Sequence, residues 1–150
     1  MIELLFIESL RLHPPGYYLN KQCNEAVEID LPNDKKMFFD NKSVIYIPLM
    51  SIHQDPEYYT DPLQFNPDRF SPENGGTKKY KDQGVFFPFG DGPRICVGMR
   101  FATVQAKIAI ATIVKNFVIT VNPKTPKEFI IDPQAIVNTI KGCLLDLKEI

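Results

Sequence analysis

One cysteine in this chain has a setting that suits chemistry at sulfur. Cys96 lies in the segment Phe89-Gly-Asp-Gly-Pro-Arg-Ile-Cys-Val-Gly98, called here the Cys96 loop, just before a long apolar run. Gly90 and Gly92 allow a tight turn, because glycine adopts backbone angles that other residues avoid. A thiol at or near the first turn of a following helix meets unpaired N–H groups and the positive end of the helix dipole, which favour the thiolate. Arg94 adds a cation that can pair with a carboxylate, so the pattern predicts a protected thiolate next to an acidic cofactor.

A charged pair near the start of the chain is the second candidate. Glu8 and Arg11 are three residues apart in a segment that reads as an amphipathic helix, so they lie on one helix face. An exposed pair of this kind contributes less than about 1 kcal/mol. A buried pair would be hard to replace, because removing one partner leaves the other charge unpaired. His13 and His53 do not lie in clusters with the spacing of metal ligands, so we expect structural roles for both.

The elements that must position these residues follow from periodicity and from the prolines. A helix is expected over residues 2–13, ended by Pro14-Pro15, because the residue before a proline avoids helical angles. The apolar run after the Cys96 loop predicts a second helix over residues 98–116. Charged and polar side chains interrupt that run, which favours a buried helix over a membrane span. Short strands are expected over residues 27–31, 43–47, 118–121, 135–139 and 144–147.

The middle of the chain is expected to be mostly irregular. Residues 40–42 form a predicted turn in which Asn41 takes the unusual backbone angle. One short helical turn is expected at Pro56–Tyr59, and residues 60–88 read as largely without regular structure. Within them, the polar stretch from Ser71 to Gly84 is expected not to pack, because it is too rich in Gly and Lys.

Length and composition bound the remaining possibilities. A chain of 150 residues fits one domain with a real core, and 44% hydrophobic residues is ordinary for a soluble domain. The net charge of −1 gives no indication of binding to nucleic acid or to an anionic membrane. Three cysteines without a C-x-x-C spacing argue against a disulfide framework or a zinc knuckle, and they fit a reducing compartment. Cys23 and Cys143 are interpreted as inert thiols.

The Cys96 loop reads F-x-x-G-x-R-x-C-x-G and resembles the cysteine-ligand loop of the cytochrome P-450 family of haem-thiolate monooxygenases. Every fixed position of that pattern is filled, by Phe89, Gly92, Arg94, Cys96 and Gly98. A match of this kind rarely arises by chance.

Two further motifs follow the order of that family. Glu8-Ser-Leu-Arg11 matches the E-x-x-R of its K helix, and Phe65-Asn-Pro-Asp-Arg-Phe70 matches the segment that supplies a second arginine, Arg69. The resemblance runs from about residue 1 to residue 150. Within the family, the sequence most resembles the microsomal enzymes of insects, on the basis of three segments: Leu12-His-Pro-Pro15, His53-Gln-Asp-Pro56 and Met99-Arg-Phe101.

The resemblance implies a fold and a domain organisation. Residues 1–150 would be the C-terminal, haem-binding portion of a single cytochrome P-450 domain, a mixed α/β fragment of a mainly α fold. Its parts would be a K-type helix, short β-strands, an irregular meander, the Cys loop, a long L-type helix and C-terminal strands.

The same resemblance implies a cofactor and roles for individual residues. Haem b would be held with Cys96 as the axial ligand of its iron, and thiolate donation favours O–O bond cleavage. Phe89 would shield the ligand side of the haem, and Arg94 would pair with a propionate. Lys21 stands where the family commonly has arginine; it keeps the charge but loses the bidentate fork. Glu8, Arg11 and Arg69 would form a partly buried cluster with a structural role.

Partners and location are also implied only by the family. A complete relative would be anchored in the endoplasmic reticulum membrane, facing the cytosol, and would insert one atom of O₂ into a lipophilic small molecule. Electrons would come from NADPH through a flavoprotein reductase. Lys78, Lys79 and Lys81 would be either a solvated loop or part of a basic docking surface for it. Residues 14–18 and 133–138 would border the substrate pocket, unless they are ordinary core.

Two alternatives remain open at the level of sequence. The family's membrane anchor and oxygen-activating helix have no counterpart here, and Met1 lies seven residues before Glu8, so the chain reads as a fragment. One alternative is therefore a catalytically inactive piece that at most binds haem. The other is a haem-thiolate isomerase or dehydratase that needs no reductase. Substrate, regiochemistry and independent folding are not predicted by these residues.

Overall fold

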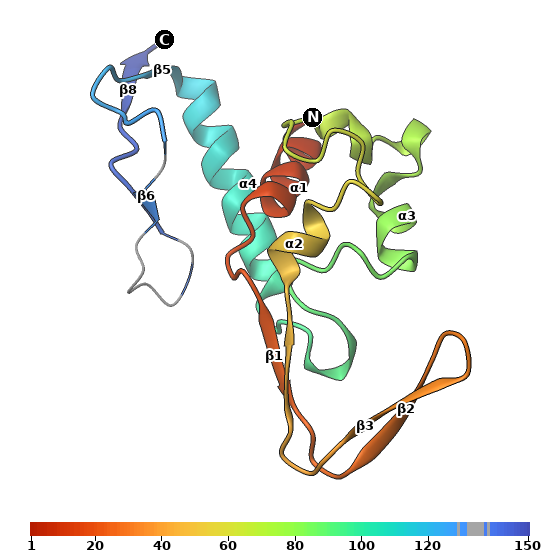
Figure 1. The fold of residues 1–150 in the computed structure, drawn as a ribbon. Helices are drawn as coiled ribbons and strands as arrows, with labels where there is room; N and C mark the ends of the chain where they lie inside the picture. Colours follow the sequence, from red (N-terminus) through yellow and green to blue (C-terminus); the bar gives the residue numbers. More distant parts are fainter. Residues whose placement is uncertain (129, 132–136, 138) are drawn as a thin grey trace.

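The computed structural model describes residues 1–128, 130–131, 137 and 139–150, and it combines helices with short strands, as expected (Figure 1). Its elements are, in chain order, α1 (Ile2–Leu12), β1 (Leu19–Gln22), β2 (Val27–Leu31), β3 (Lys35–Phe39), β4 (Val44–Ile47), α2 (Leu49–His53), the 3₁₀ segments η1 (Pro67–Phe70) and η2 (Pro72–Asn74), α3 (Gly76–Asp82), the 3₁₀ segment η3 (Gly92–Arg94), α4 (Met99–Asn116), β5 (Phe117–Val121), β6 (Ile130–Ile131), β7 (Ile140–Lys141) and β8 (Leu145–Glu149).

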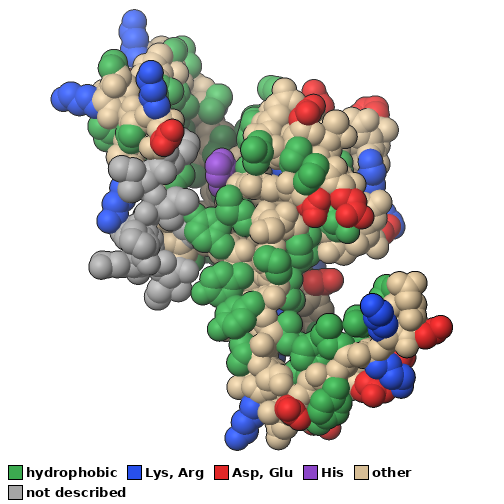
Figure 2. Space-filling view, viewed as in Figure 1, with side chains coloured by type: hydrophobic (Ala, Val, Ile, Leu, Met, Phe, Trp, Pro, Cys, Tyr) green, Lys and Arg blue, Asp and Glu red, His purple; other side chains and the backbone are tan. Residues whose placement is uncertain are grey.

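The described strands form four antiparallel pairs rather than one sheet. Strand β1 pairs with β4, with Leu19 opposite Ile47 and Lys21 opposite Ile45. Hairpin β2–β3 extends from the far end of that pair and projects away from the helices (Figure 1). Figure 2 shows hydrophobic side chains gathered on the hairpin, where Phe38 is 61% exposed. The β5–β8 pair lies at the other end of the molecule, beyond α4.

A buried aromatic cluster forms the core beneath α1. Its members are Tyr59, Phe70, Tyr80, Val85 and Phe86, with the partly buried Leu4, Ile7 and Ile52 packed against them. Tyr59 stacks on Tyr80 with ring centroids 4.7 Å apart, and Phe70 meets Tyr80 edge-on at 5.2 Å. These contacts join the turn that follows α2 to η1 and α3, so segments with little regular structure are held by ring packing.

The polar stretch from Ser71 to Gly84 is the clearest correction to the sequence interpretation. It holds η2 and the helix α3, and Tyr80 on α3 is only 5% exposed. Gly75 adopts φ +91°, which lets the chain turn sharply into the helix. The stretch therefore packs, because one aromatic side chain inserts in the core while its lysines remain in solvent.

Helix α4 follows the predicted range but not the predicted burial. It begins at Met99 and ends at Asn116, and none of its residues is buried. Apolar side chains such as Phe101, Val104 and Ile108 are more than half exposed. In this chain α4 contacts α1 and β5, which cover only part of its surface. Within the described residues, no helix is long and apolar enough to cross a membrane.

Most of the remaining local predictions can be compared with the structure. The expected strands at 27–31, 43–47, 118–121 and 144–147 correspond to β2, β4, β5 and β8, and residues 55–59 form one helical turn. In the turn at 40–42 the prediction is wrong in detail, because Lys42, at φ +68°, takes the left-handed angle in place of Asn41. Most of the strand expected over residues 135–139, and most of the pocket border over 133–138, lie outside the described residues.

Candidate functional site

The backbone of the Cys96 loop is fixed on both sides of the cysteine. The Cys96 N–H donates to the carbonyl of Phe89 at 2.9 Å, and the Cys96 carbonyl accepts from the Met99 N–H at 3.2 Å. Gly90 and Gly92 have φ of +80° and +72°, so the tight turn uses left-handed angles at the two positions expected from sequence. Cys96 lies three residues before α4, near its first turn as expected, with an exposed side chain and a free thiol.

The first strand carries Lys21 toward this loop. Leu19 and Lys21 lie on the same, half-buried face of β1, since alternate residues of a strand share a face. The Cδ1 atom of Leu19 is 3.9 Å from the point where a Cβ on Gly90 would lie. The face of β1 that holds Lys21 therefore packs beside the Cys96 loop. Sequence reasoning assigned no strand to residues 19–22, because their partner in β4 is distant along the chain.

Phe89 and Arg94 lie at different depths in the loop. Phe89 is half-buried and Arg94, at the end of η3, is exposed. Among the described residues, none forms an ion pair with Arg94, so its guanidinium is available to an anion. Gly98 leaves room beside the thiol, because a Cβ at that position would lie 3.8 Å from the Cys96 Sγ.

A cleft of about 710 Å³ lies between α1, α4 and the start of the Cys96 loop. Phe6, Phe89 and Val104 contribute apolar walls, and Glu3 and Lys107, which also line the cleft, form an ion pair with Nζ 3.1 Å from Oε1. Ile95, the residue before Cys96, lines the cleft, whereas Cys96 itself does not.

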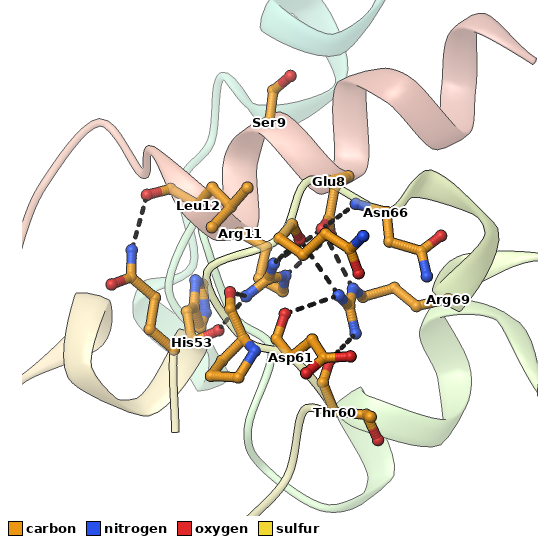
Figure 3. Close-up of polar contacts among 12 residues, drawn as sticks. Glu8, Ser9, Arg11, Leu12, His53, Thr60, Asp61, Asn66 and Arg69 are labelled. Carbon is orange, nitrogen blue, oxygen red and sulfur yellow. Dashed lines mark hydrogen bonds and ion pairs between the residues drawn. The ribbon is translucent and has the colours of Figure 1, made fainter. Parts of the chain in front are cut away.

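A second group of predicted residues forms a buried charge cluster, the Glu8 cluster, consisting of Glu8, Arg11 and Arg69 (Figure 3). Glu8 and Arg11 are 0% exposed and Arg69 is 7% exposed. Arg11 donates through Nε and Nη2 to both carboxylate oxygens of Glu8, at 2.8 and 2.7 Å. Arg69 Nε donates to Glu8 Oε1 at 3.1 Å. The alternative of an exposed surface pair is therefore wrong.

Backbone carbonyls complete the coordination of both arginines. Arg11 Nη1 donates to the carbonyls of His53 and Pro62, at 2.8 and 2.7 Å, and Arg69 Nη1 donates to that of Thr60 at 3.0 Å. The Glu8 carboxylate also accepts from the Asn66 N–H at 2.9 Å. A planar guanidinium with five donors suits this set of fixed acceptors. The cluster thereby connects α1 to an irregular segment about sixty residues later, an arrangement consistent with the structural role expected for it.

His53 is a buried residue whose partners the sequence did not identify. Its side chain is 0% exposed, and its Nε2 accepts from the Phe87 N–H at 3.2 Å. Burial, and to a lesser extent the nearby Arg11 guanidinium, together lower the pKa of His53 to about 4. The imidazole is therefore neutral at pH 7, which is consistent with the structural role expected for it. Pro48 and Pro56 flank α2, and this pair of prolines is a sequence signal for a short element between them.

The lysines considered for partner docking lie on α3. Lys78 forms an ion pair with Asp82, and the Nζ of Lys79 lies 5.2 Å from the centroid of the Tyr80 ring. Lys78, Lys79 and Lys81 are exposed, but they belong to a helix and not to the solvated loop expected from sequence. Cys23 is half-buried and Cys143 is exposed, and both are free.

The described residues contain no cluster of three or more His, Cys, Asp or Glu side chains that could hold a metal ion. An iron bound here through a single protein ligand is compatible with that arrangement, because haem supplies the four equatorial nitrogens itself.

Comparisons with known proteins place these motifs in one family. The family model named Cytochrome P450 matches residues 2–147. The chain is 46% identical over 140 residues to "Probable cytochrome P450 28d1" of Drosophila melanogaster, covering 93% of this chain and 28% of that protein. It is 42% identical to "Probable cytochrome P450 28d2" of the same organism, covering 99% of this chain and 30% of the relative.

A mammalian relative matches as well. "Cytochrome P450 3A31" of Mesocricetus auratus is 39% identical over 116 residues, which cover 77% of this chain and 22% of that protein. The chain thus spans less than a third of the length of these curated relatives. The family model covers nearly the whole chain, including the Cys96 loop and all three residues of the Glu8 cluster. The chain therefore belongs to the cytochrome P450 family, whose cofactor is haem.

Proposed function

We propose that the chain contributes the proximal half of a haem-thiolate site, with Cys96 as the axial ligand of a haem b iron. The observation that carries this proposal is the exposed, free thiol of Cys96 on a loop whose backbone is hydrogen-bonded on both sides of the cysteine. A ligand held in this way needs little ordering when the metal binds, which lowers the entropic cost of binding.

The groups around the thiol fit an anionic, planar cofactor. Arg94 is exposed without an ion-pair partner among the described residues, and Lys21 lies on the face of β1 that packs beside the loop. Both cations would pair with the haem propionates. Phe89 would exclude water from the sulfur, which tunes the potential of a ligated metal. Gly98 would leave the space next to Sγ open.

The proposed reaction is the one typical of the family. Bound haem would supply the activation of O₂, and the product would carry one oxygen atom inserted into a lipophilic small molecule. This chain's residues would hold the cofactor and donate electron density through sulfur. The Glu8 cluster does not contact the loop directly and would act by fixing α1 against the segment that leads to it.

Electron supply and location are further parts of the proposal. NADPH would provide the electrons through a flavoprotein reductase, at the cytosolic face of the endoplasmic reticulum membrane. Lys79 and Lys81 on α3 are exposed and have no acidic partner among the described side chains, so they offer positive charge to an acidic donor protein.

An absorption spectrum tests the ligand assignment. The protein is expressed with haem, reduced and exposed to carbon monoxide, and the strongly red-shifted band typical of thiolate ligation is expected. Cys96→Ser should abolish that band, whereas Cys143→Ser, which removes another exposed thiol, should preserve it. A band typical of histidine ligation, or one unaffected by Cys96→Ser, would overturn the assignment. Absence of haem uptake would favour the alternative of a chain that is inactive by itself.

A further inference from the structure

His53 lies where three segments of the molecule meet. It is the last residue of α2, and its backbone carbonyl accepts from Arg11 Nη1 of the Glu8 cluster at 2.8 Å. Its ring stacks on Phe86 with centroids 5.2 Å apart and meets Phe87 edge-on at 5.6 Å. The main chain of His53 is therefore held from α1, while its side chain holds the segment that runs into the Cys96 loop.

The hydrogen bond from Phe87 defines the tautomer of the imidazole. Because the Phe87 N–H donates to Nε2 at 3.2 Å, Nε2 carries no proton, and in the neutral ring the proton sits on Nδ1. Nδ1 is buried and has no hydrogen-bond partner among the described residues. A buried, unpaired polar atom costs free energy. The ring is thus kept in this place by its aromatic contacts and by the Nε2 bond.

The contact reaches Cys96 through two backbone hydrogen bonds. The Phe87 carbonyl accepts from the Gly90 N–H at 2.8 Å, which closes the turn at residues 87–90. Within that turn, the Phe89 carbonyl accepts from the Cys96 N–H at 2.9 Å. A hydrogen bond that fixes the Phe87 amide also fixes the first residue of this turn. The turn then positions the Phe89 carbonyl, which is the acceptor for the Cys96 N–H.

We propose that His53 is a positioning residue for Cys96, acting through the Nε2 bond to the Phe87 amide and not merely by filling space. As far as it concerns a metal ligand, this inference rests on the proposed function. Its geometric content, that the acceptor on His53 orders the Cys96 loop, is independent of any cofactor.

Two substitutions separate the hydrogen bond from the packing. His53→Phe keeps an aromatic ring of similar size between Phe86 and Phe87 but removes the acceptor, so the N–H of the half-buried Phe87 loses its side-chain partner. His53→Gln loses the ring but can place its Oε1 close to the position of Nε2. His13→Gln is the matched control, because His13 is exposed at the end of α1.

Amide hydrogen exchange followed by NMR gives the first readout. For His53→Phe, the protection of the Phe87 and Cys96 amides should fall at least about tenfold, a factor equivalent to about 1.4 kcal/mol. His53→Gln should restore protection toward the wild-type value, and His13→Gln should leave it unchanged. The β5–β8 amides serve as an internal check, since unchanged protection there shows that a variant still folds. Full protection at Phe87 and Cys96 in His53→Phe, or equal losses in both variants, would overturn the proposal.

Two further measurements keep the positioning role distinct from the haem proposal. Nitrogen NMR of the wild-type imidazole should find the proton on Nδ1, and a protonated Nε2 at neutral pH would refute the hydrogen bond without any variant. In the haem-loaded protein, His53→Phe should lose the thiolate-type carbon monoxide band and His53→Gln should recover it. If Cys96→Ser leaves the haem spectrum unchanged, the proposed function fails, while the exchange data still decide the role of His53.

Discussion

Replacing Glu8 by glutamine removes the carboxylate from the Glu8 cluster, a buried site that also holds two cations. With one carboxylate and two guanidinium groups the Glu8 cluster has a formal charge of +1, and Glu8→Gln makes it +2 with almost no change in side-chain size. The carboxylate accepts from Arg11 Nε and Nη2, Arg69 Nε and the Asn66 N–H, all between 2.7 and 3.1 Å. A glutamine amide group would direct its NH₂ at one of those donors, so one bond becomes a donor–donor contact.

The expected loss follows from the burial of this site. Removing one partner of a buried ion pair destabilises a protein by about 3–5 kcal/mol. A typical domain has a free energy of unfolding of about 5–15 kcal/mol, so this single change would remove a large share of it. The matched control is Glu28→Gln, because Glu28 pairs with Lys36 at a site where the two side chains are 50% and 61% exposed. That change should cost less than about 1 kcal/mol.

Urea unfolding of the three proteins, followed by circular dichroism, measures both losses. Adding Arg69→Met to Glu8→Gln removes the excess cation, so the double variant should be less destabilised than the sum of the two single changes. If Glu8→Gln lowers the free energy of unfolding no more than Glu28→Gln does, the cluster is not held by charge, and its burial would have to be explained by packing alone.

Three other substitutions or conditions give expected outcomes. Because burial and the Arg11 guanidinium lower the pKa of His53 from 6.5 to about 4, the unfolded state binds the proton first. The contribution of His53 to the free energy of unfolding is therefore constant above about pH 6.5 and falls by about 3 kcal/mol toward pH 4. Unfolding at pH 6.5 and 5 checks this, and an equal slope in His53→Phe would contradict it. The Tyr59 hydroxyl donates to the Val85 carbonyl at 2.8 Å, so Tyr59→Phe should cost about 1 kcal/mol in chemical unfolding, and no loss would show that this bond contributes nothing net. Gly92→Ala should lower the free energy of unfolding by about 1–2 kcal/mol through the left-handed backbone angle alone, since no atom outside the adjoining residues lies within 4 Å of the added Cβ. Gly98→Ala is the control, because Gly98 has φ −83° and should cost less. Equal losses in the two variants would refute the strain argument.

Local signals carried most of the successful predictions. The helix ended by Pro14, the alternation in β2 and β4, and the apolar run of α4 depend on neighbouring residues, and the structure contains each of them. The motif residues of the Glu8 cluster also meet as expected, because a resemblance over the whole chain includes contacts that no local pattern contains.

Predictions failed where a distant partner decides the conformation. Tyr80 is buried by Tyr59 and Phe70, rings that lie ten or more residues earlier. The lysines around Tyr80 in α3 therefore led to the wrong prediction that this stretch does not pack. His53 Nε2 accepts from the Phe87 N–H, 34 residues later, and nothing in the type of either residue predicts this pairing. The burial expected for α4 was wrong in this chain because the described elements cover only part of it.

The Glu8 cluster also has a consequence for the order of events during synthesis. Glu8 and Arg69 are separated by 61 residues, and the ribosome adds about 5–20 residues per second, so about 3–12 s pass between them. During that interval α1 has emerged with only Arg11 to neutralise its carboxylate. Hairpin β2–β3 is local and lies inside the same interval, so it can form first and shorten the loop that must close. The nascent chain would therefore remain without its central anchor until the segment carrying Arg69 leaves the exit tunnel.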